Sequence, residues 1–215
     1  MSHTIKGCIF DLDGVIVDTA KYHGLAWTRL ADSLGVPFNE HDNEQLKGVG
    51  RIESLEYILN KGNISLSEEE KVRLASKKNE WYLEFVRTMQ PDEVLPGAVA
   101  FLTELKQKGI KIALGSASKN ARLVLELTNT LHLFDAIVDG TRTTQSKPHP
   151  QVFLMGADDL GLKPSECIVF EDAISGIDAA LAGGFTAIGI GSPNVLTKAH
   201  KVFAGLSEVT VADVL

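Results

Sequence analysis

Short apolar runs along the chain alternate with longer stretches in which apolar residues recur every three or four positions. The short runs predict strands at Gly7–Phe10, Lys111–Gly115, Ala136–Asp139, Cys167–Glu171 and Thr186–Ile190. The longer stretches predict helices at Ala98–Lys108, Asn120–Leu127, Pro150–Leu160 and Gly176–Ala182. Because strands and helices of these lengths alternate, we expect parallel βαβ units and therefore a doubly wound α/β fold with a parallel sheet.

Residues 17–94 follow a different pattern. Two amphipathic helical stretches, "TAKYHGLAWTRLADSLG" and "SEEEKVRLASKKNEWYLEFVRTM", occur there with no strand between them. Ser67 followed by Glu70 is a capping box that predicts the start of the second helix. We therefore expect a helical cap domain at 17–94, inserted after the first strand of a Rossmann-like core formed by 1–16 and 95–215.

Composition narrows the class of protein. The chain has 215 residues, a net charge of -7 and a pI near 5.4, which argues against nucleic acid as a partner. We expect no signal peptide, and no apolar stretch approaches the ~18 residues of a membrane span. Cys8 and Cys167 each open an apolar run and are expected to be buried free thiols. These features predict a cytoplasmic protein without a membrane partner, with a monomer as the default.

Two aspartates, Asp11 and Asp13, come directly after the first predicted strand, in "IFDLDGVIVDT". Residues i and i+2 of a strand share a face, and doubly wound folds bind ligands at the carboxyl ends of their strands. Two carboxylates this close repel each other, which raises the pKa of one of them unless a cation intervenes. The pair therefore predicts one aspartate that stays ionised beside a metal and one that can hold a proton.

Three other stretches place polar residues at the same edge of the predicted sheet. Ser116 follows the second strand, Lys147 precedes a helix bounded by prolines, and Glu171 and Asp172 end the fourth strand. Taken singly, each has an ordinary explanation as a turn, a loop, a surface lysine or a helix cap. Taken together, several carboxylates, a hydroxyl and an ammonium predict a site for Mg²⁺ and a phosphate group.

The order of these stretches resembles the four motifs of the haloacid dehalogenase superfamily of phosphoryl-transfer enzymes. The matching segments are "FDLDGVIVDT", "GSASKN", "SKPHP" and "VFEDAISGIDAALAGG". The resemblance implies that Asp11 is the nucleophile that becomes an aspartyl phosphate and that Asp13 is the general acid and base. It also implies that Ser116 and Lys147 bind the transferring phosphate. The metal ligands implied for one Mg²⁺ per chain are Asp11, the main-chain carbonyl of Asp13, Asp172 and the nearby Glu171.

Further segments, "DTAKYHGLAW", "NEQLKGVGR", "KKN" and "SASKN", resemble the sugar-phosphate mutases of this superfamily. This resemblance implies an isomerase that interconverts β-D-glucose 1-phosphate and D-glucose 6-phosphate. Glucose 1,6-bisphosphate would serve as intermediate and primer. Because a bisphosphate must bind in two orientations, a second phosphate site is implied, with Arg51 as its guanidinium. The implied substrate contacts are Thr19, His23, Trp27, Lys47, Gly48, Arg51, Lys78, Ala117, Ser118, Lys119 and Asn120.

Several alternatives remain open at this point. Lys47 and Arg51 are also typical of solvated cations at a helix start, and Trp27 is also typical of a helix core. The alternative function is a capped Mg²⁺-dependent phosphatase that acts on a small sugar phosphate. A sugar-phosphate sensor without activity would be marked by loss of Asp11, Asp13 or Lys147, all of which are present. The residues leave the sugar and its anomer undetermined.

Overall fold

The computed structural model describes residues 4–46 and 49–213, which divide into two compact units. The core unit contains the described residues up to Asp18 and from Gln90 onward, and the helical unit is Thr19–Met89. The predicted insertion at 17–94 was therefore longer at both ends. Val17 and Val94 belong to the core unit because they pair in an antiparallel bridge, and the amide of Leu95 donates to the carbonyl of Ile16 at 2.8 Å.

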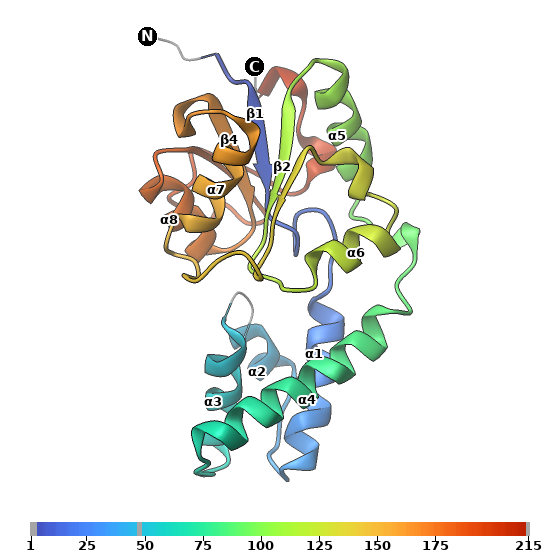
Figure 1. The fold of residues 1–215 in the computed structure, drawn as a ribbon, viewed down its shortest axis with the longest axis vertical. Helices are drawn as coiled ribbons and strands as arrows, with labels where there is room; N and C mark the ends of the chain where they lie inside the picture. The colour runs from blue at the N-terminus through green and yellow to red at the C-terminus, as the bar shows by residue number, and fades with distance from the viewer. Residues whose placement is uncertain (1–3, 47–48, 214–215) are drawn as a thin grey trace. The chain divides into compact units, whose positions relative to one another are not determined.

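The core unit is built on a parallel sheet that, among the described residues, has six strands in the order β3-β2-β1-β4-β5-β6 (Figure 1). The strands are β1 Gly7–Phe10, β2 Lys111–Gly115, β3 Ala136–Val138, β4 Cys167–Glu171, β5 Thr186–Ile190 and β6 Lys201–Phe203. All four residues of β1 and all five of β4 are buried, as expected for strands covered on both faces. The predicted doubly wound α/β fold is confirmed.

Strand β1 lies at the point where the strand order reverses. Phe10 is paired with Leu114 of β2 on one side and with Phe170 of β4 on the other. Doubly wound sheets bind ligands at the carboxyl ends of the strands beside such a switch point. Residues that follow β1, β2 and β4 are therefore placed where a ligand would bind.

The helices of the core unit cover both faces of the sheet. They are α5 Ala98–Gln107, α6 Ala121–Leu127, α7 Gln151–Leu160 and α8 Ile174–Ala182. On one face, Ile9 and Val169 pack in a core cluster with Phe153 of α7 and Ile177 of α8. On the other face, the ring of Phe10 stacks on that of Phe170 at 4.6 Å, with Phe101 of α5 edge-on to both. Short 3₁₀ turns occur at Pro91–Glu93, Leu131–Leu133, Pro164–Glu166, Leu206–Glu208 and Val211–Asp213.

The helical unit consists of α1 Ala20–Ser33, α2 Glu40–Gln45, α3 Arg51–Lys61 and α4 Glu68–Val86. The capping box predicted at Ser67 and Glu70 is confirmed, because each side chain accepts a hydrogen bond from the other residue's backbone amide. The unit has its own buried core, to which Trp27 and Leu30 of α1, Leu55 of α3 and Ala75 of α4 contribute.

Candidate active site

Asp11 directly follows β1 and is buried, with its backbone amide donating to the carbonyl of Phe170 at 2.9 Å. The chain then turns sharply, and Asp13 lies at this turn in a short bridge with Val17. Gly14 has a φ of 76°, and a Cβ there would lie 2.0 Å from Oδ2 of Asp172. Only glycine fits this turn without strain, and its small size lets Asp172 lie against the end of β1.

Glu171 is the last residue of β4, and 1% of its surface is exposed. Its Oε1 accepts hydrogen bonds from the backbone amides of Asp172 at 3.1 Å and Ala173 at 3.0 Å. Gly176 in the first turn of α8 packs against the same side chain, because a Cβ there would lie 2.0 Å from Oε2 of Glu171. Helix α8 therefore approaches the end of β4 closely and fixes the position of this carboxylate.

Lys147 joins these two strand ends. Its Nζ lies 2.7 Å from Oδ1 of Asp11 and 2.8 Å from Oε2 of Glu171, and its side chain is 9% exposed. Burial lowers the pKa of Lys147, but the charges of the two carboxylates outweigh burial, so its pKa lies above the usual range. The ammonium therefore stays charged at neutral pH and offers a positive point charge to a phosphoryl oxygen.

The carboxylates carry more negative charge than one lysine neutralises. Burial raises the pKa of Asp11 to about 7, with Glu171 adding to the rise and Lys147 opposing it. Burial also raises the pKa of Asp172 to about 9, together with the charges of Glu171 and Asp11. Oxygens of the three carboxylates lie within 4.8 Å of one another. Hard oxygen ligands with unbalanced charge fit a divalent cation such as Mg²⁺.

Ser116 follows β2 at the same edge of the sheet, and 2% of it is exposed. Its amide donates to the carbonyl of Val138 at 3.0 Å, and its Oγ accepts from the amide of Ser118 at 3.1 Å. The Oγ of Ser118 in turn accepts from the amide of Asn120 at 3.2 Å. The same loop contains Ala117 and Lys119, both of which are exposed. The substrate contacts predicted for the core unit therefore all lie on this short segment.

In the helical unit, His23 of α1 and Lys78 of α4 form a close pair. Nζ of Lys78 lies 2.8 Å from Nδ1 of His23, whose ring stacks on Tyr82 at 4.1 Å. The ammonium also lies 4.2 Å from the ring centroid of Trp27. Burial, and then the charges of Lys78 and Arg51, hold the pKa of His23 well below its usual value. The imidazole is therefore neutral, and its Nδ1 accepts the hydrogen bond from Lys78.

Arg51 begins α3, and its guanidinium donates to Oδ1 of Asn79 on α4 at 2.8 Å. Asn79, beside Lys78 in the segment "KKN", was a weaker predicted substrate contact, whereas Tyr82 was not predicted. Tyr82 lies four residues after Lys78 on α4 and so on the same face of that helix, which is the signal that could have pointed to it. The helical unit thus brings Arg51, Lys78 and His23 together, whereas their assignment as substrate contacts stays a prediction.

The other predicted residues of the helical unit have different surroundings. Thr19 is fully buried at the start of α1, where its carbonyl accepts from the amides of Tyr22 and His23. Trp27 is 3% exposed and packs in the core of this unit, as its place on α1 already indicated. Lys47 and Gly48 lie outside the described residues.

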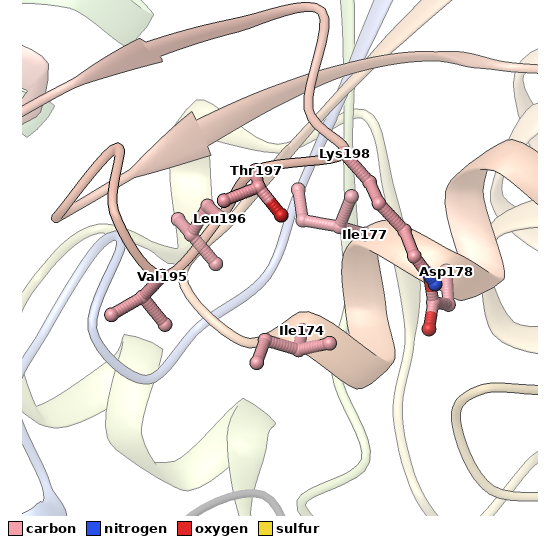
Figure 2. A pocket seen from close by; sticks show the side chains of 7 residues that line it. All are labelled: Ile174, Ile177, Asp178, Val195, Leu196, Thr197 and Lys198. Carbon is pink, nitrogen blue, oxygen red and sulfur yellow. The ribbon is translucent and has the colours of Figure 1, made fainter.

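An apolar pocket of about 70 Å³ lies between α8 and the segment after β5 (Figure 2). It is lined by Ile174, Ile177, Asp178, Val195, Leu196, Thr197 and Lys198. Its one cation, Lys198, is paired with Asp178 at 2.8 Å, so the lining offers no unbalanced positive charge to a phosphate. The pocket also contains none of the predicted site residues, and the candidate active site is therefore at the strand ends.

Within the described part of the chain, none of the helices combines the length and the apolar character that crossing a bilayer requires.

The four motifs predicted a parallel sheet with an aspartate, a serine, a lysine and an acidic pair at one edge. The structure has this arrangement, with Asp11 as the candidate nucleophile. The chain belongs to the haloacid dehalogenase-like hydrolase family, whose model matches residues 5–184. A β-phosphoglucomutase of Bacillus subtilis is 40% identical over 209 residues, which are 96% of this chain and 92% of that protein.

Two further similarities bear on function. The crystal structure of a β-phosphoglucomutase from Clostridium difficile matches with a TM-score of 0.93 and 42% identity, covering 98% of this chain and 96% of that one. A phosphorylated carbohydrates phosphatase of Thermotoga maritima is 32% identical over 86% of this chain and 84% of that protein. Relatives of this chain therefore include both mutases and phosphatases.

Proposed function

We propose that this protein is a Mg²⁺-dependent β-phosphoglucomutase, an isomerase that interconverts β-D-glucose 1-phosphate and D-glucose 6-phosphate. The reaction passes through an aspartyl phosphate on Asp11 and through β-glucose 1,6-bisphosphate. The observation that carries the proposed chemistry is the buried ion-pair cluster in which Lys147 lies 2.7 Å from Asp11 and 2.8 Å from Glu171. Lys147 would neutralise charge where a negative nucleophile meets a negative phosphate ester.

In the proposed first half-reaction, a carboxylate oxygen of Asp11 attacks phosphorus, and the bond from phosphorus to the sugar oxygen breaks. Asp13 donates its proton to that departing oxygen. In the second half, a hydroxyl of the bound sugar monophosphate loses its proton to Asp13 and attacks the aspartyl phosphate. The phosphoryl group leaves Asp11 with the sugar, and both aspartates return to their starting states.

Asp11, Glu171 and Asp172, with the carbonyl of Asp13, would hold the Mg²⁺ ion. When bound, the cation supplies positive charge that favours the ionised form of the nucleophile and screens the phosphoryl oxygens. The raised pKa values of Asp11 and Asp172 support this assignment, because a bound cation would favour the ionised form of carboxylates that burial and mutual repulsion disfavour. Ser116 donates a hydroxyl hydrogen bond to the same phosphoryl group in this proposal.

The choice of a mutase rests on the similarity to two β-phosphoglucomutases and on cations outside the phosphoryl-transfer cluster. Arg51 and Lys78 lie in the helical unit, and Lys119 lies in the loop after β2. Arg51 would contact a phosphate group, since a guanidinium matches phosphate geometry, and Ser118, Lys119 and Asn120 are the phosphate contacts proposed for the loop after β2. His23 and Lys78 would contact the sugar, with Lys47, Gly48 and Ala117 as further contacts, whereas the buried Thr19 and Trp27 would support α1.

A capped sugar-phosphate phosphatase is the second candidate, and the similarity to the phosphatase of Thermotoga maritima favours it. The chemistry at Asp11 would be the same, with water in place of the sugar hydroxyl. The two functions differ in whether a closed site excludes water and positions the sugar.

The test is to mix the purified protein with Mg²⁺, β-glucose 1-phosphate and a trace of glucose 1,6-bisphosphate. Glucose 6-phosphate and free phosphate are then followed in the same tube. We expect glucose 6-phosphate to form much faster than phosphate and only from the β anomer. Phosphate as the main product would favour the phosphatase, whereas no product from any sugar phosphate would overturn both functions.

A further inference from the structure

Lys147, the lysine of the candidate site, belongs to a loop that is mostly exposed. Residues 139–150 connect β3 to α7, and most of them are exposed. Lys147 differs from its exposed neighbours, with a side chain that is 9% exposed and paired with Asp11 and Glu171. A lysine side chain is a flexible four-carbon stem, so the position of its ammonium depends on how firmly the backbone beneath it is held.

The side chain of Gln151, the first residue of α7, forms hydrogen bonds to the backbone of this loop. Its Oε1 accepts hydrogen bonds from two consecutive backbone amides, those of Thr144 at 2.9 Å and Gln145 at 2.8 Å. Its Nε2 donates to Oγ1 of Thr144 at 3.3 Å. One side chain therefore accepts from two main-chain amides that have no partner in a strand or helix. Only Ser146 separates these two residues from Lys147.

The start of the loop is fastened to the same helix. The guanidinium of Arg142 forms two hydrogen bonds to the carboxylate of Asp159 on α7, at 2.5 and 3.1 Å, and donates to the carbonyl of Ile137 at 2.8 Å. The backbone amide of Gln151 also donates to Nδ1 of His149 at 3.2 Å, beyond Lys147. A turn spans Lys147 itself, since the amide of His149 donates to the carbonyl of Ser146 at 3.0 Å. Of the side-chain anchors, Gln151 is the one that holds the backbone of Thr144 and Gln145, which leads into this turn.

We propose that Gln151 is a positioning residue that sets the place of Lys147 against Asp11 and Glu171. It acts through the loop backbone and touches none of the reacting groups. Its catalytic consequence rests on the proposed function, in which Lys147 binds the transferring phosphate. Without the Gln151 hydrogen bonds, the amides of Thr144 and Gln145 would bond to water and the loop would sample more conformations. The ammonium of Lys147 would then spend less time beside Asp11 and Glu171.

The test compares Gln151→Met, which keeps the length of the side chain but removes the acceptor, with Gln151→Glu, which keeps an oxygen for both amides. The first readout is the rate at which acetic anhydride labels Lys147, followed by peptide mass spectrometry. The second is kcat/KM with β-glucose 1-phosphate and with p-nitrophenyl phosphate, all with Mg²⁺. Gln107→Met, at an exposed glutamine that ends α5, is the control for loss of a surface glutamine.

We expect Gln151→Met to label Lys147 faster and to lose about 10- to 100-fold in kcat/KM, the range that follows from misplacing a group by about 1 Å. Gln151→Glu and Gln107→Met should match the wild type in both readouts. Wild-type labelling or wild-type kcat/KM in Gln151→Met would overturn the proposal, as would a Gln151→Glu protein that behaves like Gln151→Met.

Two arrangements keep the result decisive. If Gln151→Met does not fold, Gln151→Ser replaces it, because serine suits the start of a helix and is too short to reach the loop. If the wild type turns over neither sugar phosphate nor aryl phosphate, the proposed function fails, and the labelling rate of Lys147 alone decides whether Gln151 holds the lysine in place.

Discussion

At the scale of single residues, Lys147 connects three of the four sequence motifs. Its Nζ lies within 2.8 Å of both Asp11 and Glu171, which come from different strands. Such a buried group of charges is stable only when each member is paired, so loss of one partner leaves the others uncompensated. Burial first, and then the same imbalance of charge, raises the pKa values of Asp11 and Asp172.

The metal-free protein should show this imbalance as a dependence of its stability on pH. The pKa of Asp172 rises from 3.8 to about 9, so the folded state binds a proton that the unfolded state releases. The corresponding stability is present below pH 3.8 and is lost as pH rises through about 9. In a chelator, Asp172→Asn should therefore match the wild type near pH 4 and become more stable than it toward pH 9. Urea unfolding across this range measures the difference.

Addition of Mg²⁺ is the matched control for that experiment. The ion should raise the unfolding free energy of the wild type at neutral pH and stabilise Asp172→Asn much less, because a ligand stabilises the state that binds it. A wild type that gains stability over Asp172→Asn with rising pH in the chelator would contradict the electrostatic account.

Site residues that directly follow a buried strand could be predicted from the sequence. Asp11 and Ser116 were predicted because polar residues follow apolar runs, whereas Lys147 was predicted from its place before a helix bounded by prolines. The hydrogen bonds of Gln151 to the loop were not predictable, since a glutamine at a helix start has no distinctive pattern. The contact of Asn79 with Arg51 likewise depends on how two helices pack, which spacing alone does not give.

At the scale of elements, the approach of α8 to the end of β4 decides where Glu171 lies. Gly176→Ala should push a methyl group into the Glu171 carboxylate, since the Cβ would lie 2.0 Å from Oε2. Because overpacking a buried site costs about 1–3 kcal/mol, we expect a loss of that size in unfolding free energy. Activity should fall as well, because Glu171 also holds Lys147.

Gly156→Ala is the comparison for that prediction. Gly156 is also a buried helical glycine, but a Cβ there would lie 3.4 Å from Ile9, at ordinary contact distance. The change should be neutral or stabilising by up to about 1 kcal/mol, because alanine is the better helix former. Equal unfolding free energies of the two variants would show that α8 does not restrain Glu171 as described.

Most elements of the core unit were predictable because buried parallel strands leave continuous apolar runs. The predictions for β1, β2, β4 and β5 are confirmed, and β3 ends one residue earlier, at Val138. Strand β6 was not predicted, since its three residues, "KVF", include a lysine and form no apolar run, unlike the "AIV" of β3. Helix α2 was also missed, because its capping box pairs Asn39 with Asp42 in place of the usual Ser or Thr with Glu or Gln.

At the scale of the whole molecule, the two compact units carry different parts of the proposed chemistry. The phosphoryl-transfer cluster of Asp11, Lys147 and Glu171 belongs to the core unit, and the cations Arg51 and Lys78 belong to the helical unit. The sequence predicted this division because one long stretch lacks strands. It misplaced the boundaries by a few residues, because the bridge between Val17 and Val94 is a contact between distant parts of the chain.

The central claim is that phosphate passes through the carboxylate of Asp11, and the most direct measurement is to locate a phosphoryl group on the protein. The protein is mixed with Mg²⁺ and excess β-glucose 1,6-bisphosphate, quenched in acid and digested for mass spectrometry. We predict one phosphoryl group on Asp11, none in Asp11→Asn, and a loss of turnover in that variant of at least about a thousandfold. Turnover that persists in Asp11→Asn, or a phosphoryl group on another residue, would contradict the account.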